Sequence, residues 1–150
     1  MRPTYQTQKD LENEAEVIGQ LAEHYKSEST KLKDYFPLDY AFVRDKRIVS
    51  LAEVKCRNYS SSQIDSFGGL IISAHKMLYA KQYHDAFLLP FVLALRLIDG
   101  IFVFVVKAVD PFPKFPLVVG GRTDRNDPQD IEPCCLISMD HFKKLGDTNA

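Results

Sequence analysis

The sequence has few cysteines, and their arrangement excludes the common cysteine frameworks. It contains 3 cysteines among 150 residues, an odd number, and Cys134 and Cys135 are neighbours. No CxxC pair is present and the 4 histidines are scattered. We therefore expect neither a disulfide framework nor a structural zinc site.

Long apolar runs and an N-terminal leader are also absent. The most apolar region, 86–106, is interrupted by Pro90, Arg96 and Asp99. It therefore does not reach the roughly 18 residues that a membrane-spanning helix needs. The first residues lack the apolar segment of a signal peptide. These absences predict a cytoplasmic protein without a membrane-embedded part.

The chain has no excess charge of one sign. With 19 basic and 20 acidic residues its net charge is −1, which argues against coating nucleic acid through bulk electrostatics. A local basic face stays open, because the middle third contains Arg44, Lys46, Arg47, Lys55, Arg57, Lys76 and Lys81. The apolar content of 45% and charged content of 26% are typical of a globular protein. We expect one domain over 1–150, with a core at about 10–108 and a loop-rich extension at about 109–150.

Hydrophobic periodicity predicts a helix followed by a β-hairpin. Apolar residues recur at helical steps over 10–27, with Asp10 as the expected N-cap. Glu14 shares the inward stripe of this helix, where an unpaired carboxylate is costly to bury. The hairpin is predicted to have strands at about 38–43 and 48–55.

The register of this hairpin decides which charges meet. If Arg44 pairs with Ile48, then Asp39 lies opposite Glu53, and period-two alternation places both on the face of Lys55. A slip of one residue would move Asp39 to the opposite face. Glu53 and Lys55 are then either a structural ion pair or part of a metal site, and the strand alone leaves both open.

The remaining pattern predicts a helix over 67–85 and a second hairpin turning at Asp99-Gly100, with Pro90 at a strand start or bulge. The strands of this hairpin are apolar on both faces, as in a sheet covered on both sides, and they are a candidate dimer interface. Further on, we expect an apolar run at 117–119, a last strand and a short helical turn. The tail over 120–133 carries acids without EF-hand spacing.

The sequence Glu53-Val54-Lys55, together with Asp39, suits phosphodiester hydrolysis. Magnesium prefers oxygen ligands and usually takes one or two carboxylates while it keeps several waters. Asp39, Glu53 and the Val54 carbonyl could supply such ligands. Lys55 could orient or help to deprotonate the attacking water and offset charge on the phosphate.

These residues, after the acid-bearing segment ENEAEVIGQL, resemble the PD-(D/E)XK nuclease superfamily over roughly residues 12–108. The resemblance implies an α/β (α+β) restriction-endonuclease-like fold with an αβββαβ core, whose mixed central sheet is flanked by helices. It implies that Asp39 and Glu53 bind metal, that Lys55 is the catalytic lysine, and that Glu14 helps to hold a second metal or a metal-bound water. The chain has PLD where the family motif has Pro-Asp.

Other positions match features of some family branches. Gln63 corresponds to a polar residue at the start of the next helix. The segment FGGLIISAHK resembles small phage-encoded members in which a serine and a lysine follow, here Ser73 and Lys76. These three residues and Arg57 are candidate contacts to DNA phosphates, and Lys76 could instead approach the metal site.

Together these features predict a Mg²⁺-dependent DNA endonuclease, with Mn²⁺ able to substitute, that acts as a homodimer in the cytoplasm of a phage-infected cell. Structure-selective cutting at branches and trimming of free ends both stay open. One alternative is a non-catalytic member of the fold that binds nucleic acid or protein. Another is a small interaction domain in which the sequence Glu-Val-Lys is accidental.

Overall fold

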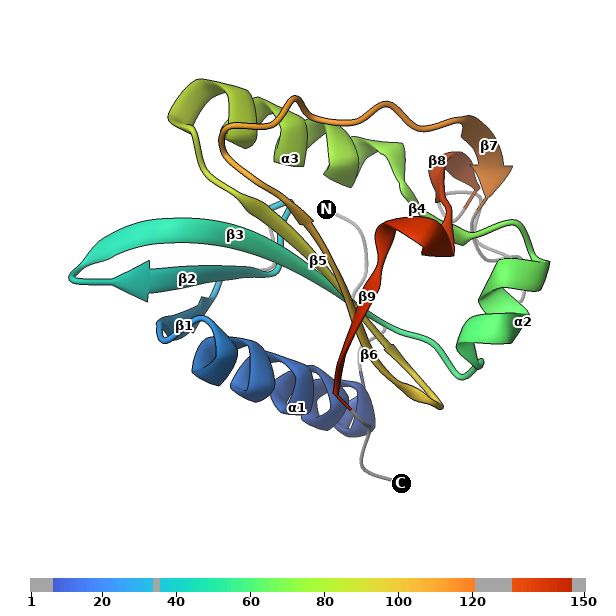
Figure 1. Ribbon diagram of the computed structural model, residues 1–150, viewed down its shortest axis with the longest axis horizontal. Helices are drawn as coiled ribbons and strands as arrows, with labels where there is room; N and C mark the ends of the chain where they lie inside the picture. The colour runs from blue at the N-terminus through green and yellow to red at the C-terminus, as the bar shows by residue number, and fades with distance from the viewer. Residues whose placement is uncertain (1–6, 34–35, 121–130, 147–150) are drawn as a thin grey trace.

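A six-stranded sheet with helices on both faces forms the centre of the computed structural model, which describes residues 7–33, 36–120 and 131–146 (Figure 1). In spatial order, its strands are β1 (Glu28–Lys31), β2 (Tyr40–Arg44), β3 (Arg47–Cys56), β5 (Phe91–Leu97), β6 (Gly100–Val106) and β9 (Lys143–Gly146). Strands β3 and β5 run parallel and the other neighbours antiparallel, so the sheet is mixed.

Helix α1 (Gln8–His24) lies on one face of this sheet and α3 (Ala74–Phe87) on the other (Figure 1). A short helix, α2 (Ser61–Ser66), follows β3. The order α1, β1, β2, β3, α3, β5 confirms the restriction-endonuclease-like αβββαβ core. Strand β1 was not predicted; it completes the three antiparallel strands of that core.

Each face of the sheet has its own apolar core. Leu51, Leu93 and Leu95 pack with Met77 and Ala80 of α3. On the opposite face Val17, Ile18 and Leu21 of α1 pack against apolar side chains of β2, β3 and β5. Strand β5 is therefore buried on both sides, as its two-sided apolar pattern predicts.

The start of α1 differs from the prediction. Thr7 is the N-cap, and Asp10 lies in the first turn. The Thr7 hydroxyl accepts from the Asp10 N–H, and the Asp10 carboxylate accepts from the Thr7 N–H, which forms a capping box. Both residue types are good N-caps, so only this reciprocal pair of hydrogen bonds distinguishes them.

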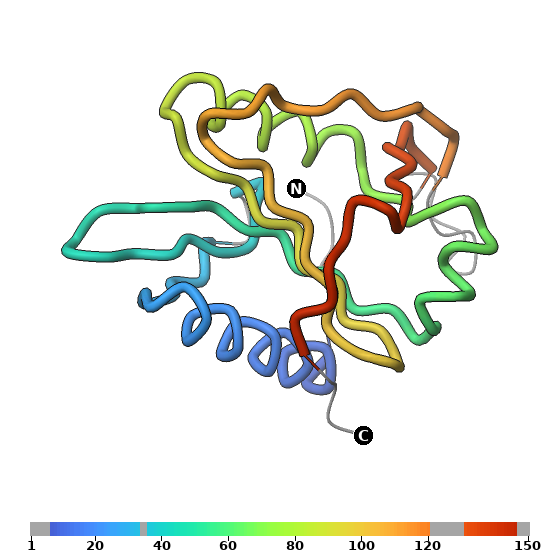
Figure 2. Tube along the Cα trace, in the orientation of Figure 1, coloured from blue at the N-terminus to red at the C-terminus, as the bar shows by residue number. Residues whose placement is uncertain are grey.

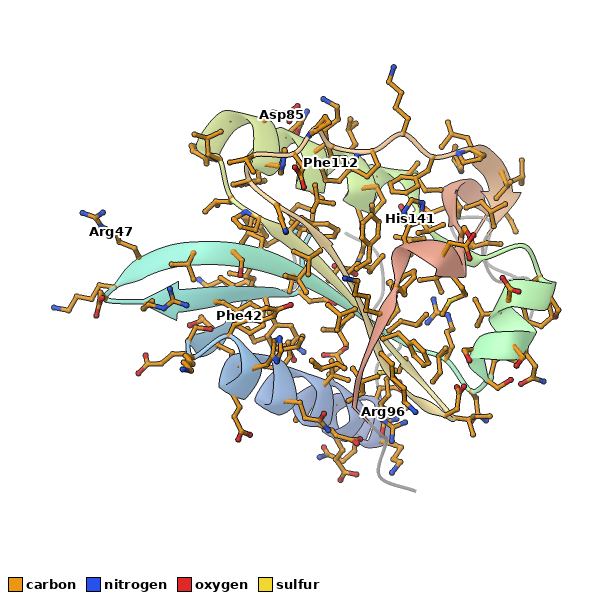
Figure 3. All side chains as sticks on the ribbon, viewed as in Figure 1. Phe42, Arg47, Asp85, Arg96, Phe112 and His141 are labelled. Atoms are coloured by element: carbon orange, nitrogen blue, oxygen red, sulfur yellow. The ribbon has the colours of Figure 1, made fainter. Side chains whose placement is uncertain are left out.

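The first hairpin has the predicted register near the site and a different one at its tip. Tyr40 pairs with Ala52, as expected, but Arg44 pairs with Arg47 and a bulge lies between Phe42 and Val43. The turn is the two-residue Asp45-Lys46, both with positive φ as in a type I′ turn. Figure 3 shows Arg47 projecting from this tip. The bulge also moves Val49 to the α1 side of the sheet, away from Leu51.

The prediction of a helix over 67–85 is correct for its second part and wrong for its first. Its first part is strand β4 (Leu70–Ser73), and α3 begins only at Ala74. Gly68 and Gly69 have φ of 92° and 134°, which end α2 and prevent a continuous helix. Strand β4 pairs with β8 (Glu132–Ile137), which also pairs with β7 (Leu117–Gly120), and the three form a second sheet.

The second hairpin turns at Ile98-Asp99, one residue before the predicted position, because Leu97 pairs with Gly100. Pro90 directly precedes β5, as predicted. The hairpin lies inside the sheet, with β3 on one side and β9 on the other. Most of its apolar residues are buried in the core, with Ile98 and Val105 exposed, so the hairpin is not the broad apolar surface that a candidate dimer interface would need.

The extension after residue 108 contains more strand than predicted. Besides β7 and β8 it contributes the 3₁₀ turn Met139–His141 and then β9, which pairs with β6. Figure 2 shows this last segment running beside β6, with which it pairs at the edge of the sheet. Of the tail acids, those at 121–130 lie outside the described residues, whereas Glu132 begins β8. None of the described helices is long and apolar enough to cross a membrane.

Candidate active site

Asp39 is held directly against β3, although it lies just before β2. Its N–H donates to the Ala52 carbonyl at 3.2 Å, and its Oδ2 accepts from the Val54 N–H at 3.0 Å. The Ala52 carbonyl thus holds the Asp39 backbone, and the Val54 N–H holds its carboxylate, one residue on either side of Glu53. The predicted opposition of Asp39 and Glu53 follows from this register.

Glu53 is fully buried, with an exposed fraction of 0%. Its Oε1 accepts a very short hydrogen bond from the Lys76 ammonium and lies 3.3 Å from Lys55 Nζ. No described residue donates a hydrogen bond to the other oxygen, Oε2, which is also buried. Oε1 of Glu53 thus has two partners, whereas Oε2 is an acceptor that no described donor uses.

Lys76 joins the two acids. Besides its contact with Glu53, its Nζ lies 3.8 Å from Asp39 Oδ1. Lys76 lies in the first turn of α3, directly after β4, so the small second sheet determines its position. The Lys76 ammonium is therefore close to one carboxylate just before β2 and to one in β3.

Burial and neighbouring charges together shift the pKa values of Glu53 and the two lysines. Burial raises the pKa of Glu53, and Asp39 adds to this, while Lys55 and Lys76 oppose it. Burial lowers the pKa of Lys55, and the nearby charge of Glu53 offsets only part of this shift. Burial also disfavours the charged form of Lys76, but Glu53 and Asp39 outweigh it and its pKa is raised. The pKa of Lys55 is thus lowered and that of Lys76 raised, although both lysines contact Glu53.

A family model described as "Phage putative PDDEXK endonuclease" matches residues 1–145 of this chain. The chain belongs to that family. Neither the curated proteins nor the solved structures gave a significant match.

The resemblance to PD-(D/E)XK nucleases implies that Glu14 lies near the metal site, but its described neighbours are elsewhere. Its Oε2 accepts from the Tyr40 hydroxyl at 3.1 Å and lies 3.3 Å from Lys31 Nζ. These contacts are on the α1 side of the sheet, whereas Glu53 faces Lys76 of α3. A role for Glu14 in holding a second metal stays a prediction.

The predicted phosphate contacts are spread over several elements. The Gln63 side chain accepts from the Ser60 N–H at 2.8 Å and so caps α2. Arg57 follows β3 and donates to the Cys56 carbonyl at 2.9 Å. Ser73 ends β4 and is the N-cap of α3 without a side-chain capping bond, so it precedes the helix that carries Lys76.

Among the residues that the structure describes, no three histidine, cysteine or acidic side chains gather at one point. The site has two carboxylates, Asp39 and Glu53, in contact with two lysines. The sequence offered Lys76 either as a phosphate contact or as a lysine near the metal site, and the structure places it beside both acids through the pairing of β4 with β8. The nearest signal in the sequence was the placement of Ser73 and Lys76 after the glycine pair.

Proposed function

We propose that this chain is a metal-dependent DNA endonuclease that hydrolyses phosphodiester bonds. The observation that carries the proposal is that Asp39 and Glu53 contact one cation, the Lys76 ammonium, with Lys55 beside them. A structural ion pair needs one acid and one base. Two acids that converge beside a lysine of lowered pKa suit hydrolysis at a bound cation.

The residues present fit a hard divalent cation. Glu53 Oε2 is a buried acceptor without a described donor, and the Asp39 side chain is 26% exposed. Asp39, Glu53 and the Val54 carbonyl would hold Mg²⁺, or Mn²⁺ in its place, with waters completing the shell. When bound, the ion would supply an acidified water and charge neutralisation at the phosphate.

The other side chains would act on the water and the DNA. Lys55 would orient the attacking water and exchange a proton with it, since its pKa is lowered by burial. Arg57, Ser73 and Gln63 would contact phosphate oxygens on either side of the scissile bond. Cutting both strands would need two active sites, which a homodimer would supply in the cytoplasm of the infected cell.

The decisive experiment measures cleavage of supercoiled plasmid and of branched and linear oligonucleotides, with Mg²⁺ and with chelator. We expect cleavage only with the metal, and a rate reduced about 100-fold or more in Lys55→Ala, because a preorganised charge is lost. Lys81→Ala is the matched control, since Lys81 is an exposed lysine of α3 paired with Asp85.

Equal cleavage by wild type and Lys55→Ala would show that Lys55 is not the catalytic lysine. DNA binding without cleavage of any substrate would favour the alternative, a non-catalytic member of the fold. Comparing branched with linear substrates tests structure selectivity, and sedimentation with and without DNA tests the homodimer.

A further inference from the structure

The Lys76 ammonium occupies the position where the two acidic side chains converge. It contacts Glu53 Oε1 directly and lies 3.8 Å from Asp39 Oδ1. Lys55 lies 3.3 Å from the same Glu53 oxygen. The two carboxylates and two ammonium groups balance in formal charge.

A divalent cation bound to both acids would meet a cation already there. Two like charges at so short a distance repel each other strongly near a protein surface, and a divalent ion doubles the repulsion. The ion and the Lys76 ammonium therefore compete for the same carboxylate oxygens. Binding of the ion requires that Lys76 move away.

The two lysines differ in how freely they can move. Lys55 extends from near the end of β3, two residues from Glu53 on the same strand, and 22% of its side chain is exposed. Lys76 reaches the acids from a separate element, α3, and 30% of its side chain is exposed. Its flexible four-carbon stem can withdraw towards solvent without moving the strand that carries Glu53.

We propose that Lys76 is a built-in counter-ion, which pairs with Asp39 and Glu53 in the metal-free protein and is displaced when the divalent cation binds. The inference rests on the proposed function, because it assumes that these two acids are the metal ligands. It explains how a fully buried carboxylate is tolerated without metal, since an unpaired buried charge would be strongly destabilising. Once displaced, the ammonium is available to pair with a phosphate of the bound DNA.

The test is a calorimetric titration of the DNA-free protein with Mg²⁺ and, separately, with Mn²⁺. Lys76→Met removes the charge and keeps the length of the side chain, Lys76→Arg keeps a cation, and Lys81→Met removes an exposed charge from the same helix. We expect Kd for the metal to fall about tenfold or more in Lys76→Met. Lys76→Arg and Lys81→Met should stay within about twofold of wild type.

In thermal denaturation, Lys76→Met should have opposite effects on the melting temperature without metal and on its increase with metal. Lys76→Met should melt at a lower temperature than wild type without metal, because Glu53 loses a partner. Saturating metal should raise the melting temperature of Lys76→Met more than that of wild type. A residue that only supported packing would lower both melting temperatures and would not tighten metal binding.

The outcomes separate this inference from the proposed function. Metal affinity that is equal or weaker in Lys76→Met than in wild type would overturn the counter-ion role, while metal-dependent cleavage by wild type would still support the nuclease. Tighter metal binding in Lys76→Met without cleavage of any DNA by wild type would support the counter-ion and reject the nuclease.

A measurement on wild type covers the case in which Lys76→Met does not fold. In a spectrum of ¹⁵N-lysine ammonium groups, the Lys76 signal, assigned by its loss in Lys76→Arg, should shift or broaden as Mg²⁺ reaches saturation. A Lys76 signal unchanged at saturating Mg²⁺ would overturn the displacement.

Discussion

At the scale of single residues, His84 is a second buried polar group with a defined electrostatic state. It is 4% exposed, and its ring lies between two acceptors, Asp85 Oδ1 at 3.0 Å from Nδ1 and the Lys107 carbonyl at 2.8 Å from Nε2. A neutral imidazole can donate from only one nitrogen, so this arrangement favours the protonated ring. Burial alone would lower the pKa of His84, but these two hydrogen bonds raise it above its ordinary value.

This raised pKa predicts how stability depends on pH. The folded state binds the proton more tightly than the unfolded state, so the contribution is complete below about pH 6.5. It is lost as the pH rises through the higher pKa of the folded state. We expect the free energy of unfolding, measured by urea denaturation between pH 5.5 and 8.5, to fall more steeply with pH in wild type than in His84→Gln.

His75→Gln is the control for this measurement, because His75 is an exposed histidine on the same helix. Both variants retain Glu53 and its neighbours, so the difference between wild type and His84→Gln isolates the imidazole. Parallel pH profiles for wild type and His84→Gln would contradict the protonated state.

At the scale of elements, α3 ends in an unfavourable conformation. Its C-cap, Leu88, has φ 54° and ψ 39°, in the left-handed region, and is 69% exposed. The Leu88 N–H donates to the His84 carbonyl at 3.0 Å, which closes the helix. Glycine is the residue that usually occupies this position, because it has no Cβ to clash.

We therefore expect Leu88→Gly to increase the free energy of unfolding by about 1 kcal/mol, since the left-handed conformation costs leucine about that much. Phe87→Gly is the matched control. It replaces the last residue of the helix itself, also exposed, and should destabilise by about 1 kcal/mol. Chemical denaturation measures both, and a loss of stability in Leu88→Gly would contradict this account of the helix end.

At the scale of the whole molecule, the small sheet connects the C-terminal extension to the site. Strand β4 pairs with β8 and continues directly into α3, which carries Lys76. Gly69 lies where the chain enters this sheet, with φ of 134°. A Cβ at this position would overlap the backbone of Ile137, with the carbonyl carbon at 2.8 Å.

We expect Gly69→Ala to lower the free energy of unfolding by about 2 kcal/mol or more, because both the conformation and the space disfavour a side chain. Gly19→Ala is the control, since nothing lies within 4 Å of its added Cβ and alanine favours a helix. Gly19→Ala should be neutral or stabilising in thermal denaturation. Similar effects of the two variants would show that β4 and β8 are not tightly paired.

Spacing within short stretches of the chain was enough to predict which charged side chains of β3 and of the first hairpin share a face. Alternation along β3 places Glu53 and Lys55 on one face, and the hairpin register brings Asp39 beside them even though its tip is shifted by a bulge. Helical periodicity located α1, and the two-sided apolar pattern of β5 correctly indicated a central strand. These features depend on residues close in sequence, whose spacing fixes their relative direction.

The neighbours of Asp39 and Glu53 outside the first hairpin come from segments that are distant in the chain. The pairing of β4 with β8 converts the start of a predicted helix into a strand and brings Lys76 to Glu53 and Asp39. On the other face, Glu14 meets Tyr40 and Lys31. Partners far apart in the chain meet through strand pairing and burial across the whole fold, and local periodicity carries no information about which distant segments will pair.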